Sequence, residues 1–349
     1  MEGTKNTNNI LWIDIAKFIA MFLVVFEHVV LAFKLNDTSY IAYFRDVVIT
    51  FHMPLFFLLS GYLYKQKSRI ENYEKILWAL VIPYFLYQFL YLPFKLGYYN
   101  LYEHIPLNIA SIKCFVGILL GDNLGTEGSK YALSVCPALW FVMVIIQLRF
   151  IFAHVNMTVK NLSIIALFSF IALKFLQLAN IDLYFCLDNT LYAIPYFAAG
   201  YYFKNYFNKK FEFSKHYKFI LFIALIGLLQ CCYILRHTYN IILVQYACGF
   251  IGSLAVITFS QLFNNANNFV NVIAKNTLFI IFFHSVLLFI TKWVKLYEIT
   301  SFMPRTYELF AFVILYSVLI YIINYFVIIL LQKPNLDVLL GKYKPRRQV

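Results

Sequence analysis

The stretch Leu11–Phe33, LWIDIAKFIAMFLVVFEHVVLAF, is an apolar segment long enough to cross a bilayer, yet it contains Asp14, Lys17, Glu27 and His28. An ionisable side chain at the centre of a membrane helix costs about 3 kcal/mol, so such residues usually face a protein interior or a water-filled cavity and mark function. Helical geometry places Lys17 and His28 about 20° apart on one face and about 16 Å apart along the axis. Asp14 lies about 60° from Lys17 on the same side. The segment therefore predicts a carboxylate and ammonium pair at one end of a helix and an imidazole further along it.

The composition predicts a membrane protein. The 349 residues are 62% hydrophobic and only 13% charged, with a mean hydropathy of +0.73. The first apolar segment is too long for a signal peptide, contains charges and has no small-residue cleavage site after it, so we expect it to remain as the first helix. The sequence predicts an all-α, polytopic helical bundle of about 10 transmembrane helices, forming a single integral-membrane domain over residues 1–349. The expected spans are 11–33, 44–64, 76–94, 137–153, 162–178, 189–203, 217–235, 240–263, 277–295 and 307–331.

The distribution of Lys and Arg predicts the orientation. With the N-terminus inside, cytoplasmic segments carry seventeen cations and the opposite loops carry eight, so both termini are expected to be cytoplasmic. The net charge of +13 is dispersed beside the spans, which argues against nucleic acid as a partner. The basic tail 333–349, containing KYKPRR, is expected to contact anionic headgroups, with phosphate recognition the weaker reading. We expect a multi-pass protein of a bacterial plasma membrane, in contact with membrane lipids.

The long outer connection, residues 95–136, contains the apolar stretch Ser111–Leu120. This stretch is too short to span and is expected to lie in the interface or to re-enter the membrane. The six cysteines show no metal-ligand spacing.

Three histidines are expected to come together within the bundle. His28 lies in the outer third of the first span, and the second span descends from the same side with His52. His284 lies near the middle of the ninth span. A single intramembrane histidine often makes only an interhelical hydrogen bond, but two at one depth with a third nearby favour a buried polar site. Glu27 points about 100° away from His28, which favours a neighbour's counter-ion or an interface group over a direct partner of His28.

The three histidines could transfer protons or bind a metal ion. An imidazole, with an ordinary pKa near 6.5, can accept a proton at neutral pH and return it. The histidines lie on three helices without a local H-x3-H pair, so no metal site is expected. Asp14 and Lys17, three residues apart, are also compatible with a neutralising ion pair near the cytoplasmic interface. No G-x-S-x-G elbow, Gly-rich phosphate loop or C-x-x-C motif is present in the sequence.

Six fragments in order resemble membrane acyltransferase family 3. They are DIAKFIAMFLVVFEH, FHMPLFFLLSGYLYK, LVIPYFLY, ALWFVMVI, YAIPYFAAGYYFK and AKNTLFIIFFHSVLL, and they cover nearly the whole chain. The resemblance implies an O-acetyltransferase that moves an acyl group, usually acetyl from acetyl-CoA, to a hydroxyl of a cell-envelope polysaccharide or lipid-linked sugar. The family's R-x10-H signature falls on Lys17 and His28, with Lys in place of Arg. Lys keeps the charge but lacks the bidentate fork that suits phosphate.

The resemblance also implies roles for the remaining site residues. His28 is expected to be the general base, and His52 a donor to the oxyanion, so both are catalytic candidates. Glu27 and His284 are expected to contact the acceptor substrate. No permanently bound cofactor is expected, and acyl-CoA serves as co-substrate. The family's R-x-x-R after the second helix is absent, because Asn72 stands where the second Arg would follow Arg69. The residues expected to contact acyl-CoA are Asp14, Lys17, Lys65, Lys67, Arg69 and Lys75.

Two other classes of protein remain open at this point. A glycan or solute transporter or flippase would use Asp14, Lys17 and His28 as a proton relay. A non-catalytic subunit of an envelope synthase would keep the fold and tolerate loss of His28. The sequence leaves open the acceptor, the acyl chain, the side of the membrane on which the acceptor is modified, an acyl-histidine intermediate and the oligomeric state.

Overall fold

The computed structural model describes residues 8–35, 39–121, 130–207, 214–239, 241–303, 306–333 and 336–341. Within these ranges the chain is helical and contains no strand, which confirms the all-α prediction. Most of the predicted basic tail, residues 342–349, lies outside the described residues, as do Lys5, Lys209, Lys210 and Arg305.

The chain divides into two compact units. Unit 1 comprises Met1–Tyr62 and Phe203–Leu330, and unit 2 comprises Leu63–Tyr202 and Leu331–Val349. The larger segment of unit 2, Leu63–Tyr202, is therefore inserted between the two segments of unit 1, and the second segment of unit 2 follows unit 1 at the C-terminus.

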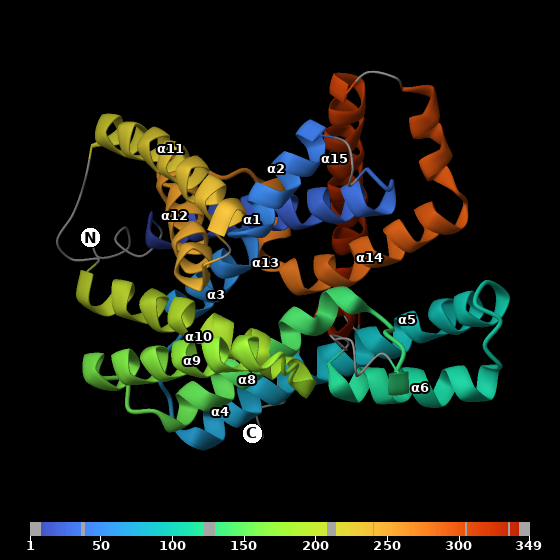
Figure 1. The fold of residues 1–349 in the computed structure, drawn as a ribbon, viewed down its shortest axis with the longest axis horizontal. Helices are drawn as coiled ribbons and strands as arrows, with labels where there is room; N and C mark the ends of the chain where they lie inside the picture. Colours follow the sequence, from blue (N-terminus) through green and yellow to red (C-terminus); the bar gives the residue numbers. More distant parts are fainter. Residues whose placement is uncertain are drawn as a thin grey trace. The chain divides into compact units, whose positions relative to one another are not determined.

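Unit 1 is built around its first helix. Helix α1 contacts α2, α12, α13 and α14, and α11 runs alongside α12 (Figure 1). The helices of unit 1 are α1 (Asn8–Ala32), α2 (Ser39–Ile49), α3 (His52–Leu63), α11 (Lys215–Tyr239), α12 (Ile242–Ser260), α13 (Asn268–Lys275), α14 (Thr277–Trp293) and α15 (Thr306–Leu331).

Side-chain size explains how α1 packs. Ala16 and Ala20 are fully buried, and such small residues allow neighbouring backbones to approach closely. Large aromatic side chains instead connect α1 with α15. The Tyr321 hydroxyl donates to the Phe18 carbonyl at 2.8 Å, and the Phe26 and Phe310 rings meet edge to face with centroids 6.0 Å apart. Because α1 is surrounded in this way, its two carboxylates, Asp14 and Glu27, are buried within unit 1.

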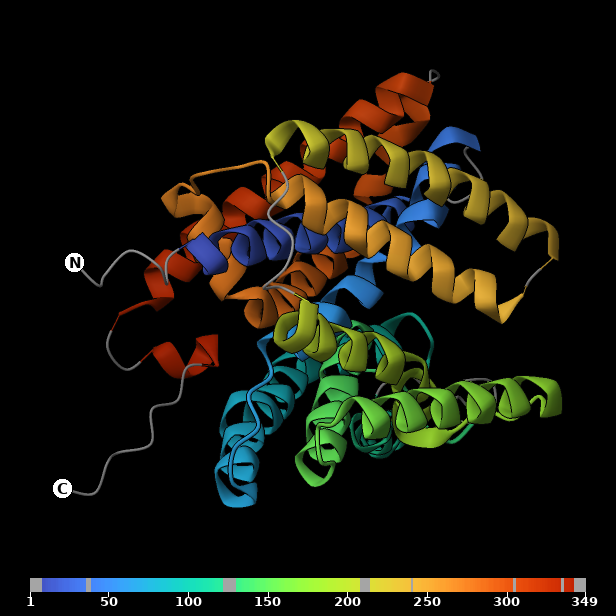
Figure 2. The same cartoon turned by 90° about the vertical axis from the view of Figure 1, so that its left-hand side faces the viewer.

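Unit 2 consists of a second set of packed helices. Helix α4 packs on α8, α5 on α6, and α10 on both α8 and α9; Figure 2 shows α9 and α10 in green running beside each other. The C-terminal segment returns to this unit, where the Tyr87 hydroxyl donates to the Leu339 carbonyl at 2.8 Å. The helices of unit 2 are α4 (Arg69–Ile76), α5 (Ile82–Leu101), α6 (Leu107–Leu120), α8 (Trp140–His154), α9 (Val159–Ala179) and α10 (Leu187–Tyr202).

The membrane spans agree with the sequence at most positions. Among the described residues, eight helices are long and apolar enough to cross a membrane, and α13 and α14, which are bent by 88° at the break between them, pass the same test only when taken together. The remaining predicted span, 189–203, corresponds to helix α10, whose 16 residues fall short of the usual span of about 20. The predicted short apolar stretch at 111–120 lies in α6, a 14-residue helix. The chain is therefore an integral, multi-pass membrane protein.

Candidate active site

Three helical segments of unit 1 bring the predicted histidines together. His28 comes from α1, His52 begins α3, and His284 lies in the middle of α14. The rings of His28 and His284 stand edge to face with their centroids 5.1 Å apart. His52 lies within electrostatic range of both Glu27 and His28. The predicted convergence of the three histidines is therefore present in the fold.

Backbone carbonyls determine the tautomers of two of these rings. The Nδ1 atom of His52 lies 2.9 Å from the Val48 carbonyl oxygen, and that of His284 lies 2.7 Å from the Ile280 oxygen. A carbonyl oxygen only accepts, so each Nδ1 carries the proton and each neutral ring presents Nε2 as an acceptor. The Nε2 atom of His284 is buried and has no hydrogen-bond partner among the described residues.

Glu27 is the direct partner of His28, contrary to the helical-angle argument. The Glu27 Oε2 atom lies 2.6 Å from His28 Nδ1. The contact is an ion pair only when the His28 ring is protonated; with a neutral ring, the carboxylate lies beside Nδ1. The 100° separation along the helix concerns the Cα–Cβ directions, whereas rotation of two long, neighbouring side chains about χ1 brings their ends together.

Exposure distinguishes His28 from the other two histidines. The His28 side chain is 30% exposed, whereas His52 is 5% exposed and His284 is fully buried. Of the three imidazoles, His28 is thus the one that a substrate can touch without a rearrangement. Glu27 lies behind it and is itself buried. The expected contact of Glu27 and His284 with the acceptor stays a prediction.

A close helix contact sets the position of His52. Thr50 and Phe51 interrupt the helix between α2 and α3, and Phe51 packs against Gly252 of α12. A methyl group at Gly252 would lie 2.3 Å from Phe51 Cγ, so only glycine leaves room for this ring. The next residue is His52, and its depth in unit 1 therefore depends on this contact.

The Asp14 and Lys17 end of α1 contains a further cation. Asp14 is 7% exposed and lies within electrostatic range of Lys17 and of Lys275, the last residue of α13. The bend between α13 and α14 brings Lys275 to this end of α1. Both predicted roles, contact with the acyl donor and a structural charge pair, remain compatible with this arrangement.

The predicted basic loop belongs to unit 2. Lys65 and Lys75 line a small polar cavity together with Arg149 of α8. The Lys67 Nζ atom lies 3.5 Å from Glu71 Oε2, one helical turn away. Arg69 begins α4 and is exposed, outside that lining.

The comparison with known families agrees with this geometry. A family model for the acyltransferase domain matches residues 10–331, nearly the whole chain. The chain belongs to acyltransferase family 3. No curated protein and no solved structure matches it. Membership supports a membrane acyltransferase and does not favour the transporter interpretation.

The acyltransferase site includes one residue that sequence reasoning missed. Arg45 of α2 lies within electrostatic range of Glu27, and its guanidinium also lies 3.8 Å from the carboxylate of Asp46. Its side chain is 20% exposed. The signal was present in the sequence, because Arg45 stands at the edge of a predicted span, where an ionisable side chain is costly and often functional.

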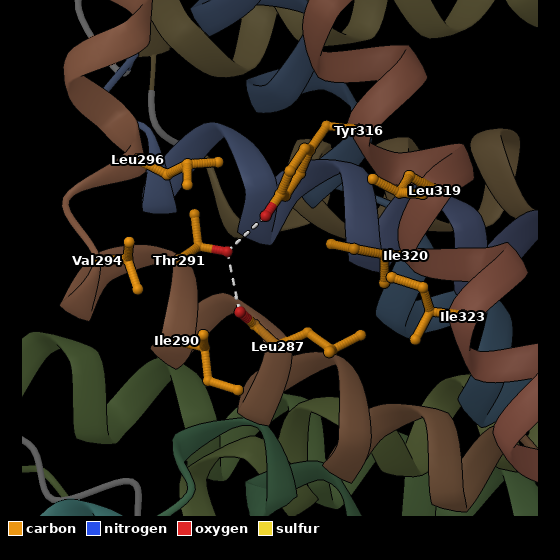
Figure 3. A pocket seen from close by; sticks show the side chains of 9 residues that line it. All are labelled: Leu287, Ile290, Thr291, Val294, Leu296, Tyr316, Leu319, Ile320 and Ile323. Carbon is orange, nitrogen blue, oxygen red and sulfur yellow. Dashed lines mark hydrogen bonds between the residues drawn. The ribbon is translucent and has the colours of Figure 1, made fainter.

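The acyltransferase also has an apolar cavity of about 150 Å³ between α14 and α15 (Figure 3). Leu287, Ile290, Leu319 and Ile323 contribute to its walls. Its polar atoms satisfy one another, because Thr291 Oγ1 lies 2.6 Å from the Tyr316 hydroxyl and donates to the Leu287 carbonyl at 2.9 Å. The cavity therefore offers apolar surface without an unpaired polar anchor.

The polar residues of the acyltransferase are not grouped as metal ligands. Within the described ranges, no three His, Cys, Asp or Glu side chains are placed to hold one ion.

Proposed function

We propose that the protein transfers an acyl group, acetyl from acetyl-CoA, to a hydroxyl of a cell-envelope polysaccharide or lipid-linked sugar, with His28 as general base. One observation carries the proposal: the partly exposed imidazole of His28 has the buried Glu27 carboxylate at its Nδ1, so a neutral ring that carries its proton on Nδ1 leaves Nε2 to accept a proton.

The reaction follows from this pairing. His28 Nε2 takes the proton of the acceptor hydroxyl as its oxygen attacks the thioester carbonyl, and the resulting imidazolium is stabilised by Glu27. Collapse of the tetrahedral intermediate breaks the carbon–sulfur bond. The leaving thiolate takes the proton back from His28, so the base is regenerated.

The oxyanion of the tetrahedral intermediate needs a hydrogen-bond donor. The tautomer of His52 decides whether this ring can donate. Because its Nδ1 proton is directed at Val48, neutral His52 has only an acceptor to offer, which suits orienting the incoming hydroxyl better than binding the oxyanion. Arg45 supplies positive charge beside Glu27 and is our candidate for balancing the developing negative charge.

The acyl donor is proposed to approach from the cytoplasmic side of a bacterial plasma membrane. Asp14, Lys17 and Lys275 would lie at that end of α1, about 16 Å along the helix from His28. The pantetheine arm of CoA is long enough to bridge such a distance. One acyl-CoA molecule would then contact the charged end of α1 and present its thioester to His28.

The test is an acyl-transfer assay. Purified protein in liposomes is supplied with radiolabelled acetyl-CoA and a crude lipid-linked glycan fraction. His28→Ala is expected to abolish incorporation, whereas His216→Ala, which removes an exposed histidine of α11, is expected to retain it.

The outcomes separate the candidate mechanisms. Incorporation that survives His28→Ala would refute the base assignment. If no acceptor becomes labelled and the liposomes take up solute in response to a pH gradient, the protein is a transporter and the proposal is refuted. If wild-type protein retains the label without an acceptor and His28→Ala does not, His28 is a nucleophile that forms an acyl-histidine intermediate.

A further inference from the structure

A small polar cavity in unit 2 brings together cations from two helices. Its volume is about 40 Å³. Helix α4 packs against α8, and this contact places Arg149 beside the loop that contains Lys65 and beside Lys75 of α4. The residues that line the cavity are Leu63, Tyr64, Lys65, Asn72, Lys75, Ile76 and Arg149.

Arg149 lacks a counter-ion. Its Nε atom is buried without a hydrogen-bond partner, and within the described ranges no carboxylate lies at ion-pair distance from its guanidinium. Lys65, Lys67 and Arg149 all repel the charge of Lys75. Glu71 of α4 lies against Lys67. A partly buried guanidinium among like charges is costly unless an anion compensates it.

Tyr64 adds a neutral donor to the same cavity. Its side chain is 6% exposed, and its hydroxyl is buried with no hydrogen-bond partner in the part of the chain that the structure describes. Burial raises the pKa of the Tyr64 phenol, and nearby Arg149 offsets this only in part. The phenol therefore stays protonated at neutral pH and has a proton to donate. A buried O–H without an acceptor points to a ligand that supplies one.

The size of the cavity suits a tetrahedral oxyanion. A cavity of about 40 Å³ is roughly three times the minimum of about 10–15 Å³ that holds one water. The donors are an Arg fork, two ammonium groups and a phenol, and the combination of Arg and Lys is typical of phosphate recognition.

We propose that Arg149, Lys65, Lys75 and Tyr64 form a binding site for a phosphate group. The source that we assign is a phosphate of the CoA donor, and this assignment rests on the proposed function. Arg149 supplies a bidentate fork that suits a phosphate group. The sequence pattern predicted that the basic loop contacts acyl-CoA but gave no role to Arg149, which lies in the apolar helix α8.

The experiment measures binding without turnover. Full-length protein in phosphatidylcholine nanodiscs is titrated with CoA, with 3′-dephospho-CoA and with pantetheine, which lacks phosphate. Arg149→Gln is expected to weaken CoA binding by about tenfold or more, the loss expected for a charge-assisted hydrogen bond, and to leave pantetheine binding unchanged. Lys160→Gln, which removes one exposed positive charge at the start of α9, is the matched control and should bind CoA like wild type.

A second arm distinguishes the sources of phosphate. Nanodiscs that contain phosphatidic acid are compared with pure phosphatidylcholine discs by thermal unfolding. A stabilisation by phosphatidic acid that Arg149→Gln abolishes, with CoA binding unaffected, would support the phosphate site and assign it to a lipid headgroup.

Two further variants keep the test independent of folding. Tyr64→Phe removes one hydroxyl and should weaken phosphate binding by a smaller factor than Arg149→Gln, while Arg149→Lys should retain part of the affinity. If Arg149→Gln and Tyr64→Phe bind CoA and respond to phosphatidic acid like wild type, the proposed phosphate site is refuted. CoA binding that depends on Arg149 in a protein that transfers nothing would refute the proposed function and retain the site.

Discussion

Adding one methyl group at Gly252 should destabilise unit 1 and disturb His52. The alanine Cβ would lie 2.3 Å from Phe51 Cγ, 2.5 Å from its Cβ and 2.6 Å from its Cδ1. Favourable carbon contacts begin at about 3.5 Å, so the overlap is about 1 Å. Because Phe51 Cβ is among the crowded atoms, turning the ring does not relieve the contact, and the backbone of α12 or of the break at residues 50–51 must move.

The expected magnitude follows from two opposing terms. Overpacking costs about 1–3 kcal/mol, and replacing Gly by Ala within a helix returns up to about 1 kcal/mol. The net loss of about 1–2 kcal/mol corresponds to a Tm lower by about 2–8 °C. Gly227 of α11 is the matched control, since no atom lies within 4 Å of an added Cβ there, and Gly227→Ala should leave the Tm unchanged or raise it.

The assay is thermal unfolding of both variants in the same detergent, followed by tryptophan fluorescence, with acyl transfer measured well below both transitions. Gly252→Ala should also reduce transfer in the folded state, because Phe51 directly precedes His52. If Gly252→Ala unfolds at or above the temperature of Gly227→Ala, the packing argument is refuted.

Three further changes test individual contacts. Glu27→Gln should lower the rate of acyl transfer by about 10- to 100-fold at saturating donor, because it removes a charge-assisted contact to the adjacent imidazole; an unchanged rate would exclude Glu27 from the mechanism. Gly121→Ala should lower the Tm by about 2 °C or more, since Gly121 has a φ of +88° and an added Cβ would lie 2.9 Å from Cys186 Sγ; an unchanged Tm would contradict this local strain. Thr291→Val should cost about 1–2 kcal/mol of unfolding free energy, measured by denaturant titration, because two hydrogen bonds are lost and the Tyr316 hydroxyl is left without Thr291; a value near zero would show that water replaces them.

The membrane helices could be predicted because the bilayer restricts the possibilities. Every backbone polar group in hydrocarbon must be paired within the protein, so an apolar run of span length becomes a helix almost regardless of its partners. This is why α1 and α9 lie where their apolar runs predict. The 88° bend between α13 and α14 was not predicted, because hydropathy alone does not distinguish a bent helix from a straight one.

The candidate site could be predicted in part, for a related reason. His28, His52 and His284 were recognisable because imidazoles in apolar spans are costly and therefore uncommon. The contact between Glu27 and His28 was missed, because it depends on side-chain rotation rather than on helical angle. Arg149 was missed because the sequence does not show that α8 would pack on α4.

The sequence by itself determined the helical membrane class, most spans, the family and the candidate base on α1. These properties depend on local hydrophobicity, on helical periodicity and on ordered fragments, all of which are encoded in short stretches of chain. Only the tertiary structure decided that Glu27 pairs with His28, that His284 stands beside this ring, and that Arg149 joins the basic loop. Those relations depend on rotamers and on helix–helix packing, which bring together residues separated by up to some 250 positions in the chain.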